Sequence, residues 1–82
     1  MPSATRAGLA SPRRAKELLD LSFLDVRCHL LETAAALDRI ERAEGSVEIA
    51  RDPRMKKIQL ALEILRSGGA DRAERFLTLF SD

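Results

Sequence analysis

The longest segment without a helix breaker runs from Pro12 to Glu44, and it constrains the fold more than any other feature of the chain. It holds no glycine and no further proline, and alanine, leucine, arginine and glutamate, which favour helices, dominate it. Ser11 can cap the first turn, Pro12 suits the first helical position, and Gly45 supplies a stop. We therefore predict one helix over residues 12–44, about 50 Å long at a rise of 1.5 Å per residue.

Apolar residues recur along this segment in alternating steps of four and three, which is the heptad spacing of helices that pair. We call these positions the seam: Leu19, Phe23, Val26, Leu30, Thr33, Leu37 and Ile40. A second apolar stripe lies beside the seam and consists of Leu24, Leu31, Ala34 and Ala35, with Leu21 and Cys28 at its far edge. At 100° per residue, the two stripes cover roughly 200° of the helix circumference, about twice what a surface helix needs. The predicted helix must therefore be covered on two sides.

A second, shorter helix is predicted over residues 53–66. Asp52 followed by Pro53 is a typical helix start, and the Ser-Gly-Gly sequence after Arg66 is a typical stop. The connector that precedes this helix alternates apolar and polar residues, so we expect its Val47 and Ile49 to contact the core.

A third helix is predicted over residues 72–80, because Asp71 and Glu74 are spaced like a capping box. Residues 1–10 have no periodicity and are expected to form a disordered tail, which leaves residues 11–82 as a single helical domain. The two shorter helices together are shorter than the first and cannot surround it. The predicted fold is all-α: one long helix, two shorter helices folded back antiparallel, and a helical bundle completed by dimerisation.

Length and composition leave few other ways to stabilise this chain. A chain of 82 residues buries only about 60% of its unfolded surface, which makes it marginal alone. Its single cysteine, Cys28, excludes an internal disulfide framework, and one cysteine with one histidine excludes a Cys/His zinc site. Oligomerisation is the remaining common route, so we predict a homo-oligomer, most simply a dimer, or else a second protein as partner.

Charge and hydropathy argue against membrane and nucleic-acid partners. The net charge is +1, three phenylalanines are the only aromatic residues, and no apolar run approaches the roughly 20 residues that span a bilayer. Residues 1–10 lack the apolar centre of a signal peptide. We therefore expect a cytoplasmic protein with no membrane contact and no cofactor.

Arg27 and Asp38 are the two charged residues that project within the apolar arc of the predicted long helix. A charge in such a place must extend to solvent or find a partner. We expect a structural ion pair that fixes helix register, with a contact across a dimer as one form of it. A polar pocket for a small ligand is the alternative.

Asp25, His29 and Glu32 share one helix face and are weak candidates for a metal site. Because this face lies opposite the seam, we expect it to be solvated and to form local ion pairs. Neither Ser22 nor Thr33 has a base placed to activate it, so we expect no catalytic residue and no enzyme activity.

The basic stretch 51–57 is the one segment that could contact nucleic acid. With the turn and the helix that follow, it resembles a helix-turn-helix unit. The helix over residues 72–80 nevertheless ends in Phe76-Leu77-Thr78-Leu79-Phe80, and these side chains suit docking better than the reading of base edges. Nucleic-acid binding is therefore the least favoured of three hypotheses.

The sequence over residues 23–27 and 31–39 resembles short bacterial helical proteins of unassigned function. The resemblance covers about a third of the chain and implies a bacterial origin but no activity. The favoured hypothesis is a non-enzymatic helical protein that acts through self-association or partner binding. The alternative is a helical bundle that binds a small ligand or a metal.

Overall fold

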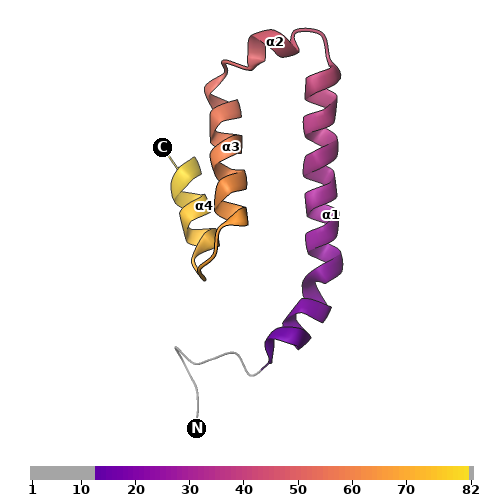
Figure 1. Cartoon of the computed structure of the whole chain (residues 1–82), viewed down its shortest axis with the longest axis vertical. Coiled ribbons are helices and arrows are strands. Elements are labelled where there is room, and N and C mark those ends of the chain that lie inside the picture. The colour runs from indigo at the N-terminus through magenta and orange to yellow at the C-terminus, as the bar shows by residue number, and fades with distance from the viewer. Residues whose placement is uncertain (1–12, 82) are drawn as a thin grey trace. The chain divides into compact units, whose positions relative to one another are not determined.

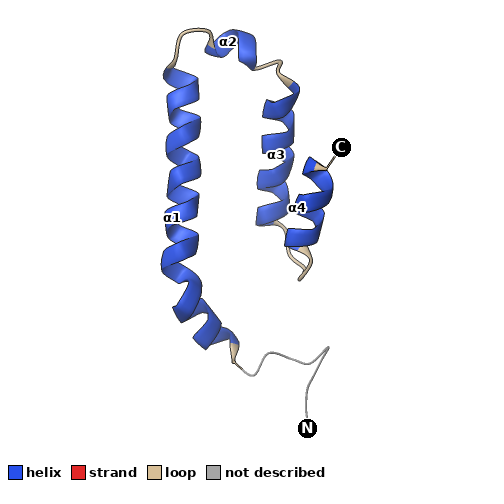
Figure 2. Cartoon of the chain, turned by 180° about the vertical axis from the view of Figure 1, so that it is seen from behind, coloured by secondary structure: helices blue, strands red, loops and turns tan. Residues whose placement is uncertain are grey.

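The structure is a computed structural model that describes residues 13–81, and all regular elements of this part are helices (Figures 1 and 2). They are α1 (Ala15–Arg42), α2 (Ser46–Ile49), α3 (Pro53–Arg66) and α4 (Arg72–Phe80). The predicted all-α class is confirmed, with one long helix and, in the described part, one short helix more than expected. The tail predicted for residues 1–10 and the cap assigned to Ser11 and Pro12 lie outside the described residues.

The chain divides into two compact units, residues 1–39 and residues 40–82, and each is described by itself. The antiparallel return of α3 and α4 along α1 stays a prediction. None of the helices in the described part is both long enough and apolar enough to cross a membrane.

α1 is one continuous helix of 28 residues, but it begins three residues later than predicted, at Ala15. Glu17 explains this start, because its Oε1 accepts a hydrogen bond of 2.8 Å from the backbone N–H of Arg14. A glutamate at the third helical position that binds the N–H just before the helix is half of a capping box. At the start of α1, the capping contact among the described residues thus comes from Glu17.

The end of α1 also comes earlier than predicted, at Arg42, because the chain turns before it reaches Gly45. Gly45 has φ 92°, in the left-handed region that residues with a Cβ avoid. The following residues form the short helix α2 instead of an extended connector. In α2, Ile49 is half-buried as expected, but the prediction for Val47 is wrong, because it is 81% exposed.

α3 begins as predicted, with Pro53 in the first turn. Asp52 is the N-cap and accepts a hydrogen bond of 2.8 Å from the backbone N–H of Arg54. α3 packs against α4 within the second unit (Figure 1). Ala61 of α3 is the one buried apolar residue in the described part of the chain, and it is 6% exposed.

The apolar residues of α4 differ in how far they are covered. Phe76 and Leu79 are half-buried, whereas Leu77 is exposed. The rings of Phe76 and Phe80 lie one turn apart, with centroids 5.0 Å apart and planes tilted by 41°, a favourable aromatic geometry. The capping box expected at Asp71 does not form, because the Asp71 side chain makes no cap bond and binds the Arg75 side chain instead.

Candidate association surface

The part of the seam nearest the N-terminus of α1 is an apolar face without cover in the single chain. Its residues Leu19, Phe23, Val26 and Leu30 are between 50% and 62% exposed. Toward the other end of the helix, Leu37 is half-buried and Ile40 is 38% exposed. α1 contains no fully buried residue. Single exposed leucines are ordinary on protein surfaces, whereas larger contiguous apolar patches are rare on monomeric proteins.

The second stripe of α1 is also uncovered over most of its length. Leu21, Leu24 and Leu31 are each more than half exposed, and only Ala35, at the far end of the stripe, is half-buried. The two-sided apolar character predicted for this helix is therefore present in the structure. Neither side buries a residue fully.

Arg27 and Asp38, the charged residues of the apolar arc, are both exposed in the single chain. Within residues 13–81, neither side chain takes part in a hydrogen bond or an ion pair. Asp20 lies on the same flank of the seam as Arg27 and is paired with Lys16, with 2.9 Å between Nζ and Oδ2. Among residues 13–81, the structure thus brings Arg27 and Asp38 to no partner.

Asp25, His29 and Glu32 are exposed as expected, with His29 at the edge of the polar face nearest the seam, but within residues 13–81 they do not form the expected local ion pairs. Among the residues that the structure describes, no three histidine, cysteine, aspartate or glutamate side chains come close enough together to hold a metal ion. The backbone carbonyl of His29 accepts a hydrogen bond of 3.0 Å from the Thr33 hydroxyl, which satisfies the one polar side chain of the seam within its own helix.

The second unit holds a small pocket that the sequence patterns did not reveal. It lies between the end of α1, α2 and the start of α3, has a volume of about 290 Å³, and is lined by Ile40, Ile49, Asp52, Arg54, Met55 and Ile58. Its lining is mostly apolar, and its volume falls at the lower limit of small-molecule sites. The apolar and polar alternation around Ile49 was the only sequence signal for it.

Two of the lining residues, Asp52 and Arg54, form a forked ion pair. The Arg54 guanidinium donates to both carboxylate oxygens of Asp52, at 3.0 Å from Nε and 2.8 Å from Nη2. These side-chain bonds, together with the bond from the Arg54 backbone N–H, lower the pKa of Asp52 from 3.8 to about 2. The pair therefore stays ionised, and it gives the α3 start a fixed geometry.

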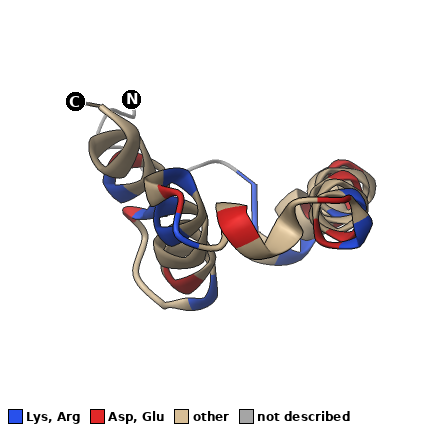
Figure 3. Ribbon diagram, turned by 90° about the horizontal axis from the view of Figure 1, so that it is seen from above, with Lys and Arg blue, Asp and Glu red and all other residues tan. Residues whose placement is uncertain are grey.

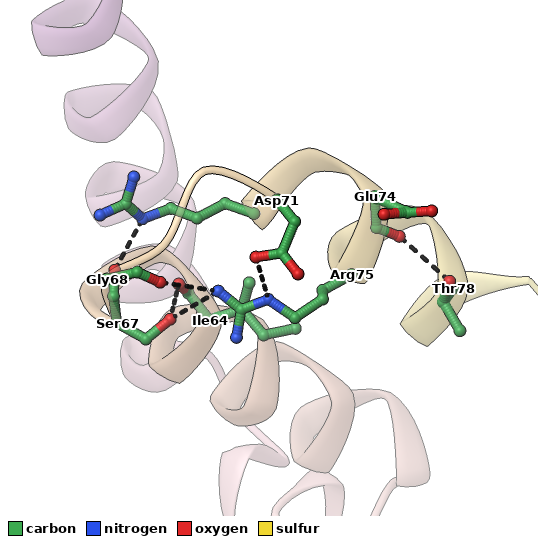
Figure 4. A network of polar contacts seen from close by, with 8 residues as sticks. Ile64, Ser67, Gly68, Asp71, Glu74, Arg75 and Thr78 are labelled. Atoms are coloured by element: carbon green, nitrogen blue, oxygen red, sulfur yellow. Dashed lines mark hydrogen bonds and ion pairs between the residues drawn. The ribbon is translucent and has the colours of Figure 1, made fainter.

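A polar network holds the turn between α3 and α4 (Figure 4). The Arg75 guanidinium donates to the Ser67 hydroxyl at 2.9 Å, to the Gly68 carbonyl at 3.1 Å and to Asp71 Oδ1 at 3.1 Å. The Ser67 hydroxyl in turn donates to the Ile64 carbonyl at 2.7 Å. One arginine thus satisfies acceptors on both sides of the turn, which is a structural role.

The basic stretch 51–57 does not form a free cationic face. Arg54 is held by Asp52, and Lys57 is half-buried. Figure 3 shows lysine and arginine interspersed with aspartate and glutamate along the helices of both units. Because the attraction of a phosphate backbone depends on clustered positive charge, nothing in this arrangement favours nucleic-acid binding.

Comparison with known proteins adds no family to these observations: no family model, no curated protein and no solved structure matches the chain. The resemblance of residues 23–27 and 31–39 to short bacterial helical proteins stays a prediction.

Proposed function

We propose that this chain is a non-enzymatic helical protein that acts by self-association, with the seam of α1 as the contact surface. The observation that carries the proposal is the exposed row Leu19, Phe23, Val26 and Leu30, which follows the alternating spacing of paired helices. An isolated amphipathic helix gains most of its stability from packing of its apolar face. α1 therefore needs a cover, and a second α1 has the matching periodicity.

Sedimentation or light scattering of the full chain tests this proposal directly. We expect a dimer that dissociates on dilution from about 100 µM to about 1 µM, the range of a moderate protein contact. A mass that stays monomeric throughout this range would overturn the proposal, because the seam would then be covered within the chain or left bare.

A matched pair of variants locates the contact on α1. Leu30→Lys places a charge on the seam, and Glu32→Lys places the same side chain two residues away on the polar face. We expect Leu30→Lys to shift the mass to monomer, because the charge would be buried without a partner, and Glu32→Lys to leave it a dimer. Equal effects of the two variants would assign the contact to another surface.

A further inference from the structure

The residues that flank the seam of α1 determine how two copies can pair, and this inference rests on the proposed function. One flank consists of the residues that directly follow Leu19, Val26, Thr33 and Ile40: Asp20, Arg27, Ala34 and Glu41. The other flank consists of the residues that directly precede Phe23, Leu30 and Leu37: Ser22, His29 and Ala36. In paired helices, side chains at these two kinds of position meet across the contact and select its orientation.

In a parallel pair, each flank meets the opposite flank of the second helix. Arg27 would then lie opposite the partner's Ser22, and Glu41 opposite the partner's Ala36, so that no ion pair forms. In an antiparallel pair, each flank meets the same flank of the second helix. Arg27 can then lie opposite the partner's Asp20, and by symmetry the same contact forms a second time.

Charge also separates this register from its two nearest neighbours among the antiparallel pairs. The register that joins Arg27 to the partner's Asp20 places the two-fold axis between residues 24 and 25. A slide by one heptad in one direction brings Arg27 against the partner's Arg27, and a slide in the other direction brings Asp20 against the partner's Asp20. Like charges that face each other disfavour both neighbouring registers.

The seam residues fit this register. Phe23 packs against the partner's Val26, so that a large side chain meets a small one, and Leu19 packs against the partner's Leu30. A parallel pair would instead place Phe23 on Phe23, Val26 on Val26, and the polar Thr33 on its own copy inside the contact. The antiparallel register places Thr33 near the end of the overlap.

The exposure of α1 supports the same register independently. The four seam residues that this pair would bury, Leu19, Phe23, Val26 and Leu30, are those that are half or more exposed. Leu37, which falls outside the overlap, is already half-buried. Arg27 has no ion-pair partner within residues 13–81, and Asp20 reaches only Lys16 on its own helix.

We propose that two copies of this chain pair antiparallel through residues 19–30 of α1, with Arg27 of each copy bound to Asp20 of the other. Lys16, Asp20 and the partner's Arg27 then form a three-residue charge network at each end of the contact. The partner is thus a second copy of the chain, and the charged flank supplies the orientation and register that the apolar seam alone leaves open.

A charge-reversal cycle on the full chain tests the ion pairs. Asp20→Arg and Arg27→Asp should each weaken the dimer about tenfold, because each replaces two attractive contacts by two repulsive ones. The double variant should recover most of the affinity, although the arginine introduced at position 20 still faces Lys16 on the same helix. Glu32→Arg, on the polar face, is the control and should change the affinity less than about twofold. Single variants without effect, or a double variant no better than the singles, would overturn the register.

A spin-label distance tests the orientation without changing the contact. Cys28 is exposed and is replaced by serine, and Arg39→Cys on the polar face carries the label. Residue 39 lies about 15 positions from the two-fold axis, so the antiparallel pair separates the two labels by about 44 Å along the helix. A parallel pair would separate them by roughly 20 Å, the width of two adjacent helices. The short distance in a stable dimer would overturn this inference and leave the proposed function intact, whereas a monomer would overturn both.

Discussion

α1 and the α3–α4 pair are both amphipathic, yet they are stabilised in different ways. α3 and α4 pack on each other, α3 contains the buried Ala61, and the hydrogen bonds of Arg75 hold the turn between the two helices. α1 has twice the length of α3 and no fully buried residue, and side-chain contacts such as the pair between Lys16 and Asp20 stay within the helix. The α3–α4 pair therefore contains its own tertiary contacts, whereas the apolar side chains of α1 are left largely exposed in the single chain.

The largest expected effect is that of Leu30→Ala. In a paired α1, this variant opens a cavity in the contact and should lower the free energy of unfolding by about 2–5 kcal/mol, measured by urea denaturation at a concentration where the dimer is populated. In an unpaired chain, Leu30 is 54% exposed, and the loss should stay below about 0.5 kcal/mol. A loss below about 0.5 kcal/mol would contradict the contrast between α1 and the α3–α4 pair, because α1 would then need no cover.

The turn of the α3–α4 pair offers a matched pair of glycine variants. Gly69 has φ 94°, and a Cβ there would lie 3.2 Å from Asp71 Oδ1, so Gly69→Ala should destabilise this unit by about 1–2 kcal/mol. A Cβ at Gly68 would meet no heavy atom within 4 Å, so Gly68→Ala should be neutral or stabilising by up to about 1 kcal/mol. Thermal unfolding followed by circular dichroism compares the two, and an equal response would mean that the turn does not limit the stability of α3–α4.

Arg75→Ala should have a smaller effect, about 1 kcal/mol, because the Arg75 side chain is partly exposed and water replaces some of its lost bonds. Arg66→Ala is the matched control, since Arg66 makes one exposed ion pair with Glu63, at 3.2 Å, and should cost less than about 0.5 kcal/mol. Urea denaturation measures both. A loss at Arg66 as large as that at Arg75 would contradict the assigned role of the turn network.

The smallest effect is a pH dependence at the start of α3. The pKa of Asp52 is lowered from 3.8 to about 2, so the folded state binds fewer protons than the unfolded state between these values. The contribution of Asp52 is therefore complete above pH 4 and is lost as the pH falls toward 2. Acid titration of helix content should show this loss for the natural chain, and Asp52→Asn should remove this component. An unchanged acid profile in Asp52→Asn would show that the capping pair does not affect stability.

Local signals in the sequence determined most of the helices. The segment without breakers predicted α1 to within three residues at each end, and Asp52 with Pro53 predicted the start of α3, because caps and proline act through the backbone of their own turn. The same reasoning failed at Asp71, whose carboxylate is drawn to Arg75 one turn further on. It failed also at Val47, because a pattern of alternation cannot show that the chain forms a short helix instead of a strand-like connector.

The sequence by itself determined that the chain is helical, that α1 is apolar on two sides, and which charges flank its seam, because these properties depend on residue type and a fixed period of 3.6 residues per turn. Tertiary structure alone decided which apolar residues are covered. It left Leu19 to Leu30 exposed, placed Ile49 beside Met55 in a pocket, and joined Arg75 to Ser67 across a turn. These outcomes depend on which surfaces meet, and residues distant in sequence decide that through packing, not through local propensity.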